Sequence, residues 1–406
     1  MTRPGSQRIL AISSFFPLPA DRGDPLRVGM YLRSLNAIAD LTVYVVRRSS
    51  TPPGLVRELE DQLPGARVLT FAPPRPRDSR KATLRMWFRS ITTGTPVWIL
   101  NRYSPELDAT LRASAQDFDV IVLLGEAAGI YSLRCTSPRK HLDKANVMSR
   151  SSKQDAVQAT SIHQSVRLAA VAWLSRRYER RVLGSVQSVA VTSPEEAARL
   201  QADYGRVADS ILPSAIELSG HPSEFDPAGR HVIWLGSLEY RSNVTGLKRF
   251  LAEGVPLLRE AGLTLLVVGS GSSPSIAKLC RETPGVEYRG FVADLASLVP
   301  YARAAVIPLW SGAGVKLKTL TLMNLGLPVA ATHVAMEGID HRAVLVTSDD
   351  CRTLSERIVG ASAQELLIAR ARGRAVLREN FSSHSFSQSV AASFCADRSQ
   401  PLQAFP

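Results

Sequence analysis

The chain has 406 residues, which is too long for one ordinary hydrophobic core and long enough for two α/β domains. Hydrophobic residues make up 45% and charged residues 21% of the chain, a composition that excludes a disordered, collagenous or fibrous protein. The formal net charge of +13 is uneven: residues 1–212 hold 30 Lys and Arg against 19 Asp and Glu, whereas residues 213–406 hold 19 against 17. The first half is therefore suited to contact phosphate groups or an anionic membrane.

The apolar run at residues 9–16 is followed by Pro17 and Pro19 and is too short to span a bilayer, so it favours a buried first strand over a signal peptide. No later segment approaches about 18 uninterrupted apolar residues. The four cysteines are scattered without CxxC spacing, which argues against a zinc ribbon or a disulfide framework. We therefore expect a cytoplasmic protein, at most peripheral on the inner face of the membrane. The cysteines are Cys135, Cys280, Cys351 and Cys395.

Short β-rich apolar runs alternate with longer helical stretches, which predicts an α/β fold of parallel sheets with crossover helices. Open parallel sheets bind ligands beyond the carboxyl ends of their strands. In the first half the predicted strands are Arg8–Ser13, Leu41–Val46, Arg67–Phe71, Asp119–Leu124 and Gln187–Thr192. In the second half they are His231–Gly236, Leu263–Gly269, Val286–Gly290, Ala304–Leu309, Val329–Thr332 and Ala343–Thr347.

Residues 213–230, rich in Pro, Gly and Ser, are typical of a linker, and a new buried strand begins at residue 231. We therefore predict one Rossmann-like domain over residues 1–212 and a second one after the linker. The stretch from residue 361 to residue 396 is predicted to be helical, without further strands.

The densest basic segment runs from Arg75 to Arg89, with six cations, one acid and the bulky apolar residues Met86, Trp87 and Phe88 among them. Cations mixed with apolar side chains suit the surface of an anionic membrane. A solvated helix whose aromatic residues pack inward explains the segment equally well. Nucleic acid is not expected as a partner, because no nucleic-acid motif accompanies the charge.

The strongest local motif is a loop of small residues, Ser311 to Gly314, between a predicted strand and a helix that carries Lys316 and Lys318. Glycines let a backbone approach a ligand, and a helix N-terminus favours an anion. Lysines in a first turn oppose the helix dipole unless an anion lies nearby, so phosphate is the expected ligand. Residues two apart do not share a helix face, which allows only one lysine to point at a diphosphate unless the turn is irregular. A plain glycine turn with solvated lysines is the alternative.

Three further segments allow two interpretations each. The turn of Gly269 and Gly271 lacks the third glycine of a dinucleotide fingerprint, and lines either a nucleotide site or an ordinary βα connection. The long loop 16–24, followed by Arg27, is either an acceptor wall or a simple connection. Asp117 and Asp119 resemble an acidic metal motif, but they precede a strand and lie away from its functional end, so we expect no metal.

Taken together, these stretches resemble the group 1 family of GT-B glycosyltransferases (family 4), over nearly the whole chain. In the first half the resemblance rests on ILAISSFFPLPADRGDPLR, DKANVMSR and YERRVLGSVQSVAVTSPEEAARL, with Glu179 in the usual place. In the second half it rests on HVIWLGSLEYRSN, LLVVGSG, VEYRGFV, GAGVKLKTLTLMNLGLPVAAT and Glu337-Gly338-Ile339.

The resemblance implies two Rossmann-like domains facing across a cleft, with a C-terminal helix that returns to the first domain. It assigns an acceptor to residues 1–212, a nucleotide-sugar donor to residues 231–375, and the returning helix and tail to residues 376–406. Transfer would retain the anomeric configuration and need neither metal nor cofactor. The acceptor would be a glycan, a lipid-linked molecule or a small metabolite. The membrane interpretation of the segment Arg75–Arg89 suits a lipid-linked acceptor.

Residue by residue, the resemblance makes Lys316 and Lys318 the catalytic cations that stabilise the leaving diphosphate. The acceptor side would include Gly23, Arg27 and Asn146. The donor side would include Gly236, Gly269, Gly271, Gly312, Gly314, Thr321 and Glu337.

Three positions depart from the family pattern. Thr321 replaces a glutamate that grips the donor ribose, Ala145 replaces a histidine, and Ser214-Ala215 replaces an asparagine-glycine pair. Two functions therefore stay open: a working retaining glycosyltransferase, or a catalytically impaired homologue that acts as a binding or scaffolding partner. A GT-B epimerase is a third interpretation, but we find no additional acid–base pair for it.

Overall fold

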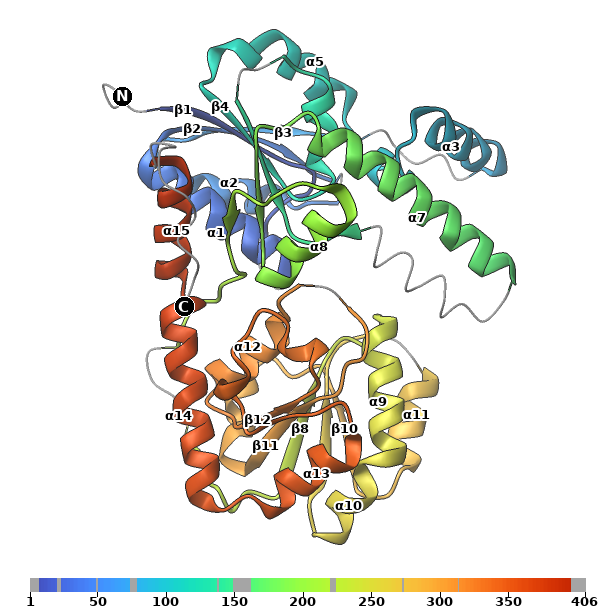
Figure 1. Ribbon diagram of the computed structural model, residues 1–406, viewed down its shortest axis with the longest axis vertical. Helices are drawn as coiled ribbons and strands as arrows, with labels where there is room; N and C mark the ends of the chain where they lie inside the picture. Colours follow the sequence, from blue (N-terminus) through green and yellow to red (C-terminus); the bar gives the residue numbers. More distant parts are fainter. Residues whose placement is uncertain are drawn as a thin grey trace. The chain divides into compact units, whose positions relative to one another are not determined.

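The computed structural model describes residues 7–19, 23–48, 50–73, 79–136, 139–148, 162–219, 224–271, 274–312 and 314–395. Arg75 and Arg77 of the basic segment, Ala313 of the glycine loop and residues 220–223 of the linker lie outside them. The chain divides into two compact units, the first formed by residues 1–214 and 386–406 and the second by residues 215–385. Each unit is built around one parallel sheet (Figure 1).

Unit 1 contains a seven-stranded sheet in the order β3-β2-β1-β4-β5-β6-β7, with every neighbouring pair parallel. The strand order reverses between β1 and β4, which is where such sheets bind ligands. The strands are β1 (Arg8–Ser13), β2 (Asp40–Val46), β3 (Arg67–Phe71), β4 (Val120–Leu124), β5 (Lys140–Lys144), β6 (Ser188–Val191) and β7 (Ser210–Ile211). The helices are α1 (Gly23–Ile38), α2 (Pro53–Gln62), α3 (Arg80–Thr93), α4 (Val97–Leu100), α5 (Pro105–Ser114), α7 (Ile162–Leu183), α8 (Pro194–Tyr204) and the C-terminal α15 (Ser383–Cys395), with the 3-10 turns η1 (Ala115–Asp117) and η2 (Ala128–Leu133).

Unit 2 contains a six-stranded parallel sheet in the order β10-β9-β8-β11-β12-β13, which reverses between β8 and β11. Its strands are β8 (His231–Leu235), β9 (Thr264–Val268), β10 (Val286–Gly290), β11 (Ala302–Ile307), β12 (Val329–Ala331) and β13 (Val346–Thr347). Its helices are α9 (Arg241–Glu253), α10 (Val255–Glu260), α11 (Pro274–Glu282), α12 (Leu317–Asn324), α13 (Cys351–Gly360) and α14 (Ala363–Asn380), with the 3-10 turns η3 (Leu295–Tyr301), η4 (Val334–Met336) and η5 (His341–Ala343).

The continuous apolar runs form the predicted strands because a parallel sheet covered on both faces buries every side chain. The bounds of β1, β3 and β10 are those predicted. The strand predicted at 343–347 is shorter, since η5 takes up its start. Strand β5 was missed altogether, because Lys140, His141, Asp143 and Lys144 give it the composition of a polar loop although all its residues are buried.

The C-terminal helix returns to unit 1, as predicted. Helix α14 ends at Asn380, and α15 then packs on α1, where the Ser387 and Ser34 hydroxyls are 2.8 Å apart and the Phe386 and Tyr31 rings meet edge to face. In unit 2, the two segments that connect it to unit 1 run parallel through the bridge between Ile216 and Ser382. Among the residues that the structure describes, no helix is both long enough and apolar enough to cross a membrane.

A buried ion pair connects α1, β5 and the end of unit 1. Arg27 donates from Nε and Nη2 to the two carboxylate oxygens of Asp143, at 2.9 and 2.5 Å, and from Nη1 to the Leu212 carbonyl at 2.8 Å. The guanidinium also lies 5.4 Å from the centre of the Phe386 ring in α15. Burial alone lowers the pKa of Arg27, but Asp143 more than offsets this effect and raises it above its ordinary value. One side chain thus holds four segments together.

We expect Arg27→Leu to lower the free energy of unfolding by about 3–5 kcal/mol, because it leaves the Asp143 carboxylate buried without a cation. Urea denaturation followed by fluorescence measures this change. Lys278→Leu is the matched control, since it removes the exposed pair between Lys278 and Glu282 and should cost less than about 1 kcal/mol. Equal losses in the two variants would show that the buried pair does not hold unit 1 together.

Candidate functional site

The glycine turns predicted to bind a donor meet at one edge of the unit 2 sheet. Gly236 follows β8, Gly269 and Gly271 follow β9, and Gly312 and Gly314 follow β11. Because these strands are parallel, their carboxyl ends lie together, and β8 and β11 flank the point where the strand order reverses. The structure therefore brings the three turns to the position at which an open α/β sheet binds a ligand.

Two of these turns touch through their backbones. The Gly236 N–H donates to the Val268 carbonyl at 3.0 Å, and a Cβ added to Gly269 would lie 1.9 Å from the Gly236 carbonyl oxygen. Gly269 also has a backbone φ of 155°, an angle that residues with a side chain rarely adopt. Glycine at 269 is thus required by packing between turns.

Lys316 lies just outside α12, at its N-cap position, with an extended backbone and no side-chain capping bond at the helix N-terminus. Lys316 was predicted inside the helix; because it lies outside, helical spacing does not keep the two lysines on different faces. Its Nζ donates to the Gly314 carbonyl and lies 3.1 Å from the Glu337 carboxylate. The two side chains are only 10% and 6% exposed, which makes this a largely buried ion pair.

Lys318, in the first turn of α12, has a different environment. Its Nζ donates to the Asn243 side-chain oxygen at 2.5 Å and lies 5.6 Å from the centre of the Trp234 ring. The Asn243 amide donates in turn to the Ser237 carbonyl at 2.8 Å, which fixes its oxygen toward the lysine. Burial, and then the nearby Lys316 charge, lower the pKa of Lys318 to about 7. A small change of surroundings therefore changes its charge near neutral pH.

Sequence reasoning missed Asn243 and Trp234. Asn243 lies in the first turn of α9 and Trp234 within β8, and both are buried. Their sequence signal was weak, because an asparagine near a helix start and a tryptophan in an apolar run are ordinary features. Thr321, predicted on the donor side, lies one turn after Lys318 on α12 and is half-buried. The second turn of α12 thus carries a partly exposed threonine side chain at position 321.

The predicted acceptor-side residues lie around the carboxyl ends of β1, β4 and β5 in unit 1. Gly23 begins α1, and Arg27 is engaged with Asp143 and Leu212. Asn146 follows β5, where its N–H donates to the Glu126 carboxylate at 2.7 Å and its carbonyl accepts from Lys144. Asp119 instead accepts from the Arg8 N–H near the start of β4, at the opposite end of the strand from Glu126.

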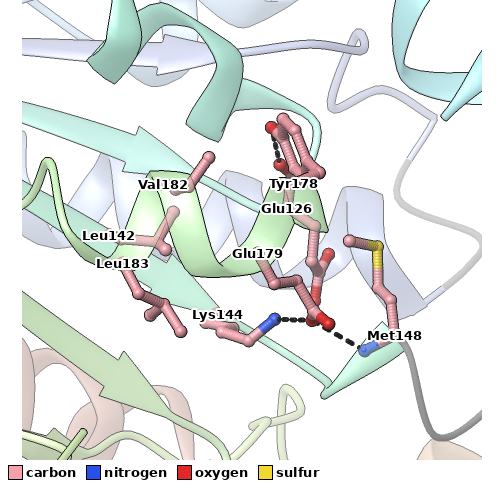
Figure 2. Close-up of a pocket in the computed structure, with 8 residues that line it drawn as sticks. All are labelled: Glu126, Leu142, Lys144, Met148, Tyr178, Glu179, Val182 and Leu183. Carbon is pink, nitrogen blue, oxygen red and sulfur yellow. Dashed lines mark hydrogen bonds and ion pairs between the residues drawn. The ribbon is translucent and has the colours of Figure 1, made fainter. Parts of the chain in front are cut away.

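Glu126 and Glu179 line a small cavity at this edge (Figure 2). Glu179 lies 2.5 Å from the Lys144 ammonium and accepts further hydrogen bonds from the Met148 N–H and the Tyr204 hydroxyl. Burial raises the pKa of Glu179, but these partners more than offset burial and lower it below its ordinary value. The pKa of Glu126 is raised, mainly by burial.

Glu126 was missed by the sequence analysis, although its position after the apolar strand β4 is a signal for a group at the ligand-binding edge. Its raised pKa, beside the Lys144–Glu179 ion pair, makes Glu126 a titratable group that a ligand at this edge would perturb. The Lys144–Glu179 pair is fully engaged by other protein groups and holds the end of β5 against α7.

The arrangement in unit 2 has features that would suit an anion. It combines a helix N-terminus without a side-chain cap, a lysine paired with a carboxylate, and a second lysine whose charge burial disfavours. An anion at this place would favour the charged form of Lys318 and interact with the N–H groups of the first turn. A diphosphate has both the charge and the number of acceptor oxygens for this environment.

We expect Lys318 to titrate near pH 7 and Lys316→Met to raise the pKa of Lys318, because the variant removes a neighbouring positive charge. Carbon-13 NMR of reductively methylated lysines measures both values. Lys278→Met removes an exposed lysine of α11, which pairs with Glu282, and should leave the titration of Lys318 unchanged. A Lys318 that titrates with the exposed lysines would contradict the environment described above.

Comparison with known proteins agrees with this geometry. Residues 229–363, which span most of unit 2, match the family described as Glycosyl transferases group 1. No curated protein matches the chain in sequence. Among solved structures, HepE from Anabaena in complex with UDP-glucose superposes with a TM-score of 0.62 at 14% identity, covering 95% of this chain and 99% of that one.

Two other solved structures share the fold over a similar span. A point mutant of TarM from S. aureus, in complex with Fondaparinux, alpha-GlcNAc-glycerol and UDP, has a TM-score of 0.65 at 11% identity, covering 96% of this chain and 100% of that one. WaaG, a glycosyltransferase involved in lipopolysaccharide biosynthesis, has a TM-score of 0.59 at 14% identity, with the same coverage. The family match over residues 229–363 and the shared two-sheet fold agree with the resemblance found in the sequence: this part of unit 2 is similar to the group 1 glycosyl transferases, and the chain has the GT-B fold of the solved structures.

Proposed function

We propose that this protein transfers a sugar, with retention of anomeric configuration, from a nucleotide-sugar donor to a glycan, a lipid-linked molecule or a small-molecule acceptor. The observation that carries the proposal is the pair Lys316 and Lys318 at the N-terminus of α12, where no side chain caps the helix. The donor diphosphate binds there, and the acceptor contacts unit 1.

The chemistry follows from the charge that develops when the bond between the sugar and the diphosphate breaks. The leaving diphosphate gains negative charge, and cations already in place stabilise that charge without reorganisation. Lys318, with a pKa of about 7, gains a proton as the anion approaches. Glu337, beside Lys316, offers carboxylate oxygens to the hydroxyls of the donor sugar. These protein cations do the work that a metal does in other transferases, so the reaction proceeds without one and activity is insensitive to EDTA.

The first donors to test are uridine diphosphate sugars, because HepE was solved with UDP-glucose and TarM with UDP. The nucleotide contacts the turns of Gly236 and Gly269, which follow β8 and β9 and pack against each other at the ligand-binding edge of the sheet. We assign Thr321, one turn after Lys318 on α12, to the donor ribose.

Thr321 also motivates a second function, a catalytically impaired homologue that binds a partner or donor without turnover. A hydrogen bond between a ribose hydroxyl and the threonine hydroxyl is roughly half as strong as one between a ribose hydroxyl and a carboxylate. The residue type at position 321, a threonine where the family pattern has a glutamate, is the observation that favours this alternative, together with Ala145 in place of a histidine.

We expect the double variant Lys316→Ala/Lys318→Ala to lower kcat/KM by about 10²–10³, because it removes both cations opposite the leaving group. Release of the nucleoside diphosphate during turnover measures this loss, and saturation-transfer NMR measures donor binding separately. Lys278→Ala is the control for loss of an exposed lysine. Unchanged turnover in the double variant would exclude the role assigned to the lysines. Donor binding without any turnover in the unmodified protein would instead favour the second function.

We also expect UDP-glucose to bind with uptake of up to about one proton at about pH 8, and with none at about pH 6, because the diphosphate raises a lysine pKa that lies near 7 in the free protein. Calorimetry in two buffers of different ionisation enthalpy measures the proton count. Lys318→Met should abolish the uptake, while Lys278→Met should preserve it. Binding that takes up no proton at the higher pH would place the diphosphate away from Lys318.

A further inference from the structure

Helix α3 exposes a stripe of large apolar side chains. Leu84, Phe88 and Ile91 are 72%, 70% and 59% exposed. Their spacing of four and then three residues places them within about 60° of one another around the helix axis. The sequence allowed the aromatic residues of this segment either to pack inward or to face outward. Phe88 faces outward.

The opposite face of α3 attaches it to unit 1. Met86 packs against the hydrophobic core, and the buried Ser90 donates to the Thr95 carbonyl at 2.7 Å. Ser79 caps the N-terminus by accepting from the Ala82 N–H, and Gly94 ends the helix in a left-handed conformation. The helix is therefore held firmly, and the exposure of the stripe is a property of the fold.

Positive charge lies directly beside the stripe. Lys81, Arg85 and Arg89 are exposed and occupy the sector between the apolar stripe and the face of Met86. Residues 80–93 contain no Asp or Glu. Half-buried Trp87 lies at the other border of the stripe. The helix thus has three sectors, of which one contacts the core, one is cationic and one is apolar and exposed.

The neighbouring helix α7 extends this surface. Figure 1 shows α3 and α7 as neighbouring helices of unit 1. The Arg181 guanidinium of α7 donates to the Thr93 carbonyl at the end of α3, at 2.5 Å. Trp173 is 55% exposed, and the Arg177 guanidinium lies 5.8 Å from its ring. The single acidic residue of α7, Glu179, is buried against Lys144, so the charges that this helix presents outward are positive.

We propose that α3, together with the adjoining cationic part of α7, docks unit 1 on a lipid bilayer that contains anionic headgroups. The apolar stripe of Leu84, Phe88 and Ile91 enters the boundary between headgroups and acyl chains, while Lys81 and Arg85 contact lipid phosphates. Charge complementarity selects this occupant: a second copy of the chain would bring the same cations against each other, and a neutral protein surface would leave them unused. Long cationic side chains beside apolar ones are also the composition that lipid interfaces favour.

Sedimentation of the full chain with vesicles tests the surface, without any dependence on catalysis. We expect binding to vesicles of phosphatidylcholine mixed with phosphatidylglycerol, weak binding to phosphatidylcholine alone, and a marked loss of binding when salt rises from about 0.1 to about 0.5 M. Phe88→Ser/Ile91→Ser should weaken binding at least about tenfold through lost apolar burial. Lys81→Glu/Arg85→Glu should weaken it as strongly at low salt, through lost attraction to the headgroups.

Two variants elsewhere serve as matched controls. Phe291→Ser removes a phenyl ring that is 75% exposed in unit 2, and Lys278→Glu reverses an exposed lysine of α11. Both should bind vesicles as the unmodified chain does. Equal binding by all variants, or no binding by the unmodified chain, would overturn the proposal. So would a dimer in solution that Phe88→Ser/Ile91→Ser converts to a monomer, since the stripe would then be a self-association surface.

Discussion

The buried charges of β5 constrain how unit 1 is put together. A lone buried ion is strongly destabilising, so each polar side chain of this strand must find a partner inside the protein. Those partners come from different elements, and the helices can therefore adopt only the positions that supply them. Lys140 donates to the carbonyls of Ser132 and Cys135, His141 contacts Tyr31 and Ser188, Asp143 binds Arg27, and Lys144 binds Glu179.

Unit 2 uses charge in the opposite way. Its core cluster consists of apolar side chains, and Lys316 and Lys318 lie at the end of the sheet beside the buried Glu337 and Asn243. Lys316 has a carboxylate partner, whereas the neutral amide of Asn243 receives Lys318, so burial lowers the pKa of that lysine. Unit 1 thus satisfies its buried ions with protein groups, while unit 2 keeps a cation whose charge an external anion would stabilise.

The sequence was sufficient to predict the two sheets, because runs of Val, Ile and Leu recur at the spacing of a βα fold. It was also sufficient to locate the loop of Gly312 and Gly314 and the two lysines. It was insufficient for β5, since polarity in the sequence conceals burial when the partners, as for His141, Asp143 and Lys144, lie more than thirty residues away along the chain. The same distance hides Asn243 from Lys318, and the amphipathic pattern of α3 did not reveal which of its faces would be outside.

Unit 1 is discontinuous in the chain, because α15 reaches it only after the whole of unit 2. During synthesis, the surface of α1 and β5 that receives Phe386 and Phe394 stays uncovered until these residues emerge, while unit 2 already has its complete sequence. Domains generally fold as units and from the N-terminus first. Here the order of completion is reversed, because unit 1 needs residues that follow the whole of unit 2. A premature stop shortly after Ser385 would therefore damage unit 1 and leave the glycine turns and lysines of unit 2 intact.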